Sequence, residues 1–305
     1  MRIIITGATG FVGTNLIPYL TNKGFETIGV TRFPKTAEEL QYNNLTIPVW
    51  NTALAMVHLA GKAHDLKGIS NENEYFEVNT ELTKTLFDKF LQSTCEVFIY
   101  MSSVKATADT VEGLLTEDVI PNPVTVYGLS KLAAEEYILS KKIPKNKHVY
   151  ILRPCMIHGP NNKGNLNLLY SFVSKGIPYP FGKYINRRSF VSVENLCFII
   201  KELIDNTKIE SGIYNIADDT SLSTVDLVQV ISEVLCKPAR ILKLPKLLVR
   251  FIAKVGDFLP IPIDSEKLQK LTGNYEVSNL KIKKAIQKNL PLTSKEGIKK
   301  TITSF

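Results

Sequence analysis

The glycine-rich segment TGATGFVG at residues 6–13 constrains the fold of this chain more than any other feature. Its glycines, Gly7, Gly10 and Gly13, follow an apolar run at residues 2–5 and open a helical pattern at residues 11–22. Here one glycine permits a tight turn, one lets the backbone approach a pyrophosphate, and one lets helix and strand pack closely. The helix N-terminus then offers amide groups to the phosphates. The segment predicts a dinucleotide-binding turn; the alternative is a glycine-rich turn without a ligand.

Apolar runs alternate with helical patterns through the first half of the chain. We expect further strands at residues 27–31, 56–60, 97–102 and 149–152, with a helix around residues 130–142. This rhythm is typical of an α/β fold with a doubly wound parallel sheet, and residues 33–55 are short for the usual crossover. After residue 155, Gly and Pro gather in loops. We expect a dinucleotide-binding domain over residues 1–155, to which residues 190–216 return, and a smaller substrate-binding lobe mainly over residues 156–305.

The end of the second strand bears on the choice of cofactor. An acidic residue here holds the ribose 2′-hydroxyl of NAD, but the strand ends Val30-Thr31-Arg32 and the next acidic residue is Glu38. A guanidinium suits a 2′-phosphate through charge-assisted hydrogen bonds. The sequence therefore favours NADP over NAD. The alternative is that Arg32 only covers the adenine.

Tyr127 and Lys131 have the spacing that places two side chains on one helix face. We expect the ammonium to lower the pKa of the phenol, so that Tyr127 can pass a proton to or from a substrate oxygen. Ser102 and Ser103 follow the apolar strand at residues 97–100, where functional groups gather at the carboxyl end of a sheet. A serine hydroxyl there can bond the same substrate oxygen, or it can cap a turn.

Composition excludes several other classes of protein. No apolar run approaches the ~20 residues of a membrane helix, and the N-terminus lacks the pattern of a signal peptide. The four histidines are scattered, so we expect no metal site. The cysteines form no CxxC pair, and we expect four buried thiols in a cytoplasmic protein: Cys95, Cys155, Cys197 and Cys236.

Positive charge gathers in the last part of the chain. Fifteen Lys and Arg face five Asp and Glu from residue 237 onward, against 22 and 24 before it. No nucleic-acid motif accompanies them, so we expect no nucleic-acid partner and a solvated basic face that attracts an anionic substrate. Residues 241–259 interleave apolar and basic residues as interfacial helices do. We expect this stretch to pack within the substrate lobe and not to associate with a membrane.

Together these motifs resemble the extended short-chain dehydrogenase/reductases, the NAD-dependent epimerase/dehydratase family, over essentially the whole chain. The resemblance also rests on the motifs that begin at His58, Arg153 and Arg187. It implies a catalytic triad of Ser103, Tyr127 and Lys131, with Lys131 also bonding the nicotinamide ribose. It implies further cofactor contacts at these residues: Gly7, Gly10, Phe11, Val12, Leu59, Ala60, Gly61 and Pro154. Members of this family often dimerise, so a homodimer is implied.

The sugar-nucleotide branch of the family adds two substrate residues. Asn165 resembles an asparagine near the phosphates of the nucleotide, and Arg188 resembles an arginine that clamps the diphosphate. The alternatives are a loop cap for Asn165 and a surface ion pair for Arg188. The related dehydratases carry an Asp-Glu pair where this chain has Val104 and Lys105, so we expect no dehydratase activity.

The resemblance extends to a subgroup similar to UDP-glucose 4-epimerase, which includes reductases of UDP-linked 4-keto-6-deoxy-hexosamines in bacterial surface polysaccharide synthesis. It implies a UDP-sugar substrate. The leading hypothesis is a 4-keto reductase that uses NADPH, because Arg32 stands where NAD-dependent epimerases carry an acidic residue. The second is a 4-epimerase with bound NAD. A third, of another class, is a binding protein that senses NAD(P) without catalysis.

Overall fold

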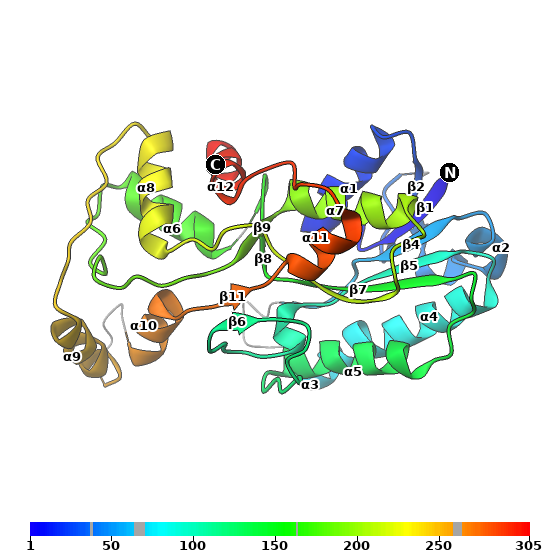
Figure 1. The fold of residues 1–305 in the computed structure, drawn as a ribbon, viewed down its shortest axis with the longest axis horizontal. Helices are drawn as coiled ribbons and strands as arrows, with labels where there is room; N and C mark the ends of the chain where they lie inside the picture. The colour runs from blue at the N-terminus through cyan, green and yellow to red at the C-terminus, as the bar shows by residue number, and fades with distance from the viewer. Residues whose placement is uncertain (37–38, 64–70, 163, 259–263) are drawn as a thin grey trace.

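A seven-stranded parallel sheet forms the larger part of the molecule (Figure 1). The computed structural model describes residues 1–36, 39–63, 71–162, 164–258 and 264–305. The strand order is β10-β7-β5-β4-β1-β2-β3. The strands are β1 (Arg2–Thr6), β2 (Glu26–Thr31), β3 (Glu39–Gln41), β4 (Ala55–His58), β5 (Val97–Met101), β7 (His148–Pro154) and β10 (Gly212–Ile216). The order reverses at β1, so the crevice for a ligand lies at the carboxyl ends of the strands.

Helices cover both faces of the sheet, as the predicted doubly wound fold requires. One face carries α1 (Phe11–Thr21), α7 (Val193–Asp205) and α11 (Leu280–Ile286). The other carries α2 (Ile47–Trp50), α4 (Leu82–Gln92) and α5 (Val126–Ser140), with α3 (Glu72–Phe76) and the π-helix η2 (Glu77–Glu81) beside them. The central strands are buried on both faces, which explains their continuous apolar runs.

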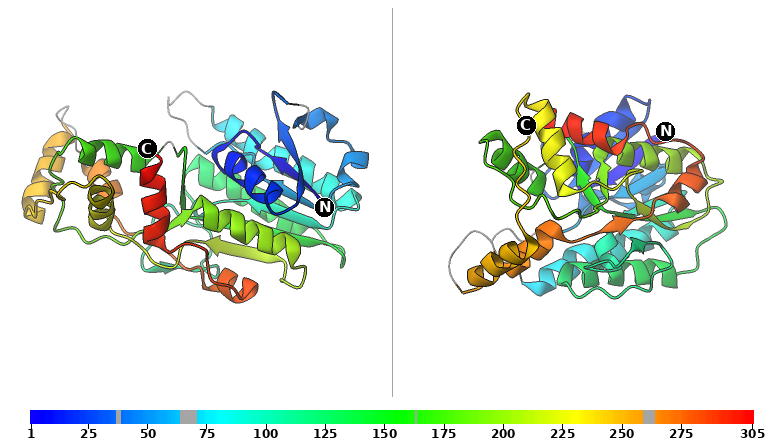
Figure 2. Two further views of the ribbon diagram at one scale, coloured as in Figure 1. Left: turned by 90° about the horizontal axis from the view of Figure 1, so that it is seen from above. Right: turned by 60° about the vertical axis from the view of Figure 1, so that its left-hand side comes forward.

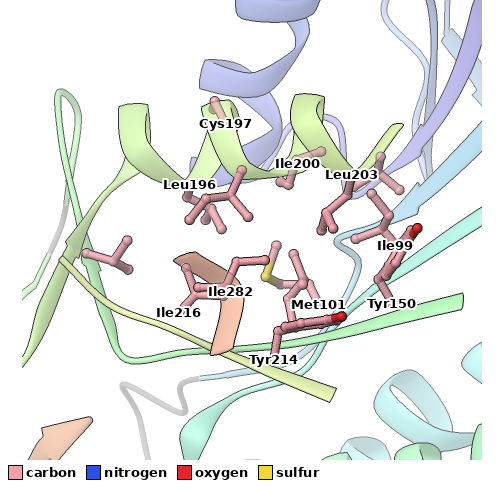
Figure 3. Close-up of a cluster of buried hydrophobic side chains, with 14 of the residues drawn as sticks. Ile99, Met101, Tyr150, Leu196, Cys197, Ile200, Leu203, Tyr214, Ile216 and Ile282 are labelled. Atoms are coloured by element: carbon pink, nitrogen blue, oxygen red, sulfur yellow. The ribbon is translucent and has the colours of Figure 1, made fainter. Parts of the chain in front are cut away.

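The core under α7 fixes the carboxyl end of β5. Figure 3 shows Leu196, Ile200 and Leu203 of α7 directed toward the sheet. Met101, the last residue of β5, lies in the same cluster and is nearly fully buried. Because its side chain is held on this face, the backbone that follows it, including Ser102 and Ser103, has a fixed starting point.

The remaining helices gather at the other end of the molecule (Figures 1 and 2). They are α6 (Asn165–Ser174), α8 (Thr224–Val234), α9 (Lys246–Gly256), α10 (Ser265–Thr272) and α12 (Ser294–Thr303). Short parallel strand pairs join the two parts: β8 (Met156–His158) with β9 (Phe190–Ser192), and β6 (Leu114–Leu115) with β11 (Glu276–Val277). The substrate-binding role of this smaller lobe, and the boundary at residue 155, stay predictions.

The segment between β2 and β4 and the four cysteines were both subjects of sequence predictions. The stretch between β2 and β4 is short as expected, with only β3, the 3-10 helix η1 (Tyr42–Asn44) and the four-residue α2. The cysteine prediction is wrong at one position. Cys95, Cys155 and Cys197 are buried, whereas Cys236 is exposed with a φ of 53° in the turn after α8.

Candidate active site

The glycine turn folds as the sequence predicts. Gly7 has a φ of +66°, and a Cβ built on it would lie 2.8 Å from the Ala60 backbone nitrogen. A Cβ on Gly13 would lie 2.5 Å from the Gly7 carbonyl oxygen, so its absence lets α1 pack against the turn. Gly10 is the N-cap residue of α1 and supplies no side-chain cap. The first amides of α1, at Phe11 and Val12, are therefore available to donate hydrogen bonds to a phosphate.

The loop after β4 closes over this turn. The Ala60 amide donates to Thr6 Oγ1 over 3.2 Å, which brings Leu59, Ala60 and Gly61 beside Gly7. His58 supports the loop from below, with Nδ1 2.6 Å from Thr6 Oγ1 and Nε2 2.9 Å from Thr83 Oγ1. Burial, with the nearby Lys131 ammonium, lowers the pKa of His58 to about 3. His58 is therefore neutral at physiological pH, and its role is structural.

Lys131 lies fully buried under the same loop. Its Nζ donates to the Met101 carbonyl oxygen over 2.8 Å and sits 4.9 Å from the centroid of the Tyr100 ring. A Cβ on Gly61 would lie 2.9 Å from Nζ, so a side chain at this position would press against the ammonium. Burial lowers the pKa of Lys131 to about 8, and the Glu135 carboxylate opposes that shift.

Tyr127 and Ser103 meet at the start of α5. Ser103 caps the 3-10 helix η3 (Val104–Ala106), and its Oγ accepts from the Lys105 amide over 3.2 Å. Burial raises the pKa of the Tyr127 phenol, and a hydrogen bond with the Ser103 side chain acts in the opposite direction. The expected lowering of this pKa is therefore wrong for the protein without ligand, because the loss of solvent outweighs the hydrogen bond with Ser103.

A glycine that the sequence reasoning missed brings these groups together. A Cβ on Gly128 would lie 2.4 Å from the Lys105 carbonyl oxygen and 2.7 Å from Pro123 Cβ. Only glycine lets the first turn of α5 press against η3 this closely. The N-cap of α5 fits the same arrangement, because Thr125 Oγ1 accepts from the Gly128 amide over 3.2 Å. The signal available in the sequence was a glycine directly after Tyr127.

A buried ion pair, also missed, underlies Lys131. Glu135 lies one turn further along α5, and its carboxylate accepts from Arg153 Nε over 3.0 Å. Ser102 Oγ donates to the same carboxylate, and all three side chains are at most 3% exposed. The network ties α5 to β5 and β7 at the level of Lys131. Arg153 also precedes Pro154, which ends β7 and is buried. A Glu four residues after Lys131 was the signal in the sequence.

Arg32 lies at the outer edge of the glycine turn. It is exposed directly after β2, and its charge acts on the Tyr42 phenol. Tyr42 itself hydrogen bonds with the Thr6 side chain and the Gly7 backbone, while burial raises the pKa of its phenol. The structure thus brings Arg32 and Tyr42 together beside the turn. Tyr42 was missed because it follows β3 and belongs to no recognisable motif.

Arg188 lies two residues before β9, in the segment that joins the two parts of the molecule. Its amide donates to the Leu222 carbonyl over 3.0 Å and its carbonyl accepts from the Leu222 amide over 2.8 Å. Arg188 also forms a β-bridge with Tyr275, so its backbone joins two segments. Burial lowers the pKa of Arg188, and Tyr275 opposes the shift. Tyr275 Oη in turn donates to the Ala108 carbonyl over 2.7 Å. Arg188 is thereby connected to the segment that carries Ser103.

Asn165 is the first residue of α6, and its side chain lies outside the described part of the structure. Among the residues that the structure describes, no group of three His, Cys, Asp or Glu could hold a metal ion.

These observations define a class of protein. A glycine turn at the end of β1, with a buried lysine and serine and a partly buried tyrosine at the same edge of a parallel sheet, is the arrangement of a dinucleotide-dependent oxidoreductase. The residues fit a nicotinamide dinucleotide: the glycine turn offers backbone amides to the phosphates, and the Lys131 ammonium can donate to a ribose hydroxyl.

Comparisons with known proteins agree with this class. The model of the "NAD dependent epimerase/dehydratase family" matches residues 3–217. A UDP-glucose 4-epimerase of Vibrio cholerae is 33% identical over 99% of this chain and 95% of its own length. A GDP-6-deoxy-D-talose 4-dehydrogenase of Aggregatibacter actinomycetemcomitans is 29% identical over 90% of this chain and 92% of its own length. The chain therefore belongs to the NAD-dependent epimerase/dehydratase family, and it is an enzyme.

A solved structure shows the same fold. A UDP-glucuronic acid 4-epimerase from Bacillus cereus, in complex with NAD, superposes with a TM-score of 0.76. The superposition covers all of this chain and 96% of the epimerase chain, at 18% sequence identity. The Rossmann-like architecture predicted from the strand and helix rhythm is thereby confirmed.

The packing at Gly7 makes a testable prediction. Gly7→Ala must strain a positive φ and push a methyl group against the Ala60 backbone, so we expect reduced stability and loss of dinucleotide binding. Gly24→Ala is the matched control, because Gly24 has a φ of +86° with nothing within 4 Å of a Cβ. It should cost only about 1 kcal/mol of backbone strain. Thermal unfolding measures the change in stability, and quenching of the protein's intrinsic fluorescence on titration with NAD measures binding. Equal behaviour of the two variants would contradict the close packing at Gly7.

Proposed function

We propose that this enzyme is a UDP-sugar 4-epimerase that works with a bound nicotinamide dinucleotide. The observation that carries the proposal is the hydrogen bond between Tyr127 and Ser103 at the carboxyl end of the sheet, next to Met101, whose carbonyl oxygen anchors Lys131. The sequence placed a 4-keto reductase first and an epimerase second. The UDP-glucose 4-epimerase relative, aligned over nearly all of both chains, supports the reverse order.

Proton transfer at the sugar is the task of Tyr127 and Ser103. A sugar hydroxyl that is to become a carbonyl must release its proton, and Tyr127 Oη is the group that can accept it and return it. Ser103, hydrogen bonded with that phenol, can bond the same oxygen and hold it in line. Burial keeps the phenol protonated in the absence of ligand, so binding must provide the positive charge that lowers its pKa.

Lys131 and Arg188 serve binding and position. The nicotinamide dinucleotide supplies the hydride acceptor and donor when it is bound. Lys131 Nζ, anchored on the Met101 carbonyl, would hold the ribose, and the loop at residues 59–61 and the turn at Gly7 would hold the adenosine and the diphosphate. Arg188 would hold the diphosphate of the sugar nucleotide. In an epimerase the sugar must present both faces to one set of residues, so a firm hold on the diphosphate allows the sugar alone to turn.

A second candidate is the NADPH-dependent reduction of a UDP-linked 4-keto sugar. Arg32 favours it, because this exposed guanidinium beside the turn suits a 2′-phosphate and no acidic residue ends β2. The binding protein without catalysis has no comparable support, since Ser103, Tyr127 and Lys131 are all retained. A cytoplasmic location and a homodimer stay predictions.

The nucleotide content of the purified enzyme distinguishes the two candidates. We expect stoichiometric NAD to be released on denaturation, identified by mass, and we expect UDP-glucose or UDP-N-acetylglucosamine to be converted at carbon 4 with no added cofactor. An empty site that binds NADPH more tightly than NADH, and consumes it only with a UDP-4-keto sugar, would overturn the epimerase and establish the reductase. In that case Arg32 would be the residue that selects the cofactor.

A further inference from the structure

Helix α9, Lys246–Gly256, presents large apolar side chains to solvent. Val249 and Ala253 are its buried residues, and they pack against Leu268 together with the partly buried Phe181, Tyr184 and Leu244. Leu247 is 80% exposed and Phe251 is 66% exposed. Phe258, just beyond the helix end, is 88% exposed. Only one side of the helix therefore packs within the lobe, as the sequence predicted, and the other side is exposed.

The exposed apolar side chains lie opposite the packed ones. At about 100° per residue, Phe251 points about 160° away from both Val249 and Ala253, and Leu247 points about 160° away from Val249 and about 120° away from Ala253. Lys246, Arg250 and Lys254 recur every four residues and form a basic row beside the apolar face. We call the exposed Leu247, Leu248, Phe251 and Phe258 the α9 apolar face.

The place of α9 in the fold leaves this face accessible. The helix lies beside α10 at the end of the molecule remote from the sheet (Figure 1). Residues 241–256 contain four Lys and Arg and no Asp or Glu. The first acidic residue after the helix, Asp257, accepts hydrogen bonds from the Ser265 amide and hydroxyl at the start of α10. A singly exposed leucine needs no explanation, but an apolar cluster of this size beside a row of basic residues marks an interaction site.

We propose that the α9 apolar face docks on an anionic lipid bilayer. An interfacial helix inserts its apolar side chains at the level of the lipid headgroups, while flanking Lys and Arg side chains meet the lipid phosphates. Both parts are present on α9. A second copy of the chain fits less well, because it would bring another basic row to an interface with no acidic residue in residues 241–256. Among the described residues, no helix is long and apolar enough to cross a membrane, so the docking is peripheral.

Vesicle flotation tests the proposal. We expect the full-length protein to float with phosphatidylcholine vesicles that contain roughly 30% phosphatidylglycerol, and not with phosphatidylcholine alone. Leu247→Ser/Phe251→Ser should abolish flotation. The matched control is Leu280→Ser, because Leu280 is 60% exposed at the start of α11 on the other lobe. Lys246→Gln/Arg250→Gln/Lys254→Gln should weaken binding about fivefold for each charge removed.

Thermal unfolding and light scattering complete the experiment. All variants replace exposed residues, so each should unfold at the temperature of the wild type and show that lost flotation is not lost folding. Wild-type protein that stays with the aqueous fraction would overturn the proposal, as would flotation that survives the double serine substitution. A change from dimer to monomer in that variant would overturn it as well, and would assign the face to a second copy.

Discussion

Tyr127→Phe should lower kcat about 10³-fold while leaving the fold and the bound dinucleotide in place. The substitution removes only Oη, the group that can exchange a proton with the substrate oxygen. Its structural cost is the hydrogen bond with Ser103, worth about 1 kcal/mol. Conversion of the UDP-sugar, followed by chromatography of the products, gives kcat, and nucleotide release with mass analysis gives cofactor content.

Tyr137→Phe is the matched control on the same helix. Tyr137 Oη donates to the Asp88 carboxylate over 2.8 Å on the far part of α5, so its loss removes a phenolic hydrogen bond without touching the crevice. We expect its kcat to stay within about twofold of the wild type. A Tyr127→Phe enzyme with near-normal kcat would show that another group carries the proton, and the proposed role of Tyr127 would be wrong.

The parts of the site that could be predicted from sequence are those fixed by short-range geometry. Gly7, Gly10 and Gly13 act within one turn of the chain, and Tyr127 and Lys131 within one turn of a helix. Their spacing is set by the backbone alone. The strand and helix rhythm predicted the sheet for the same reason, since a parallel sheet buried on both faces requires continuous apolar runs.

The parts that could not be predicted depend on contacts between distant segments. Gly128 matters only because η3 approaches it, and Glu135 only because Arg153 arrives from β7. The raised pKa of Tyr127 likewise depends on burial, which a local pattern of charges does not reveal. On α9, periodicity indicated an amphipathic helix, but which apolar side is covered depends on a partner segment far along the chain.

Lys131→Met should abolish activity and at the same time stabilise the protein without ligand. The buried ammonium has a pKa of about 8, below its value of about 10.4 in an unfolded chain. Folding at neutral pH therefore keeps a charge that costs on the order of 3 kcal/mol. Met has a similar length and no charge, and it leaves the Glu135–Arg153 pair intact. After about 1 kcal/mol for the hydrogen bond lost at the Met101 carbonyl, we expect a gain of about 2 kcal/mol at pH 7.

The pH dependence of stability identifies the source of that gain. Between pH 8 and about 10.4 the unfolded chain binds a proton at Lys131 that the folded chain has released, so the stability of the wild type should rise through this range. The Lys131→Met variant has no such group, and its advantage should shrink over the same window. Denaturant unfolding of both proteins at pH 7 and at pH 10, after removal of nucleotide, measures the difference. Lys142→Met, an exposed position two residues beyond α5, should show neither effect. If the advantage of Lys131→Met is the same at both pH values, the pKa of Lys131 is the same in the folded and the unfolded chain, and the buried charge is not the cause of the advantage.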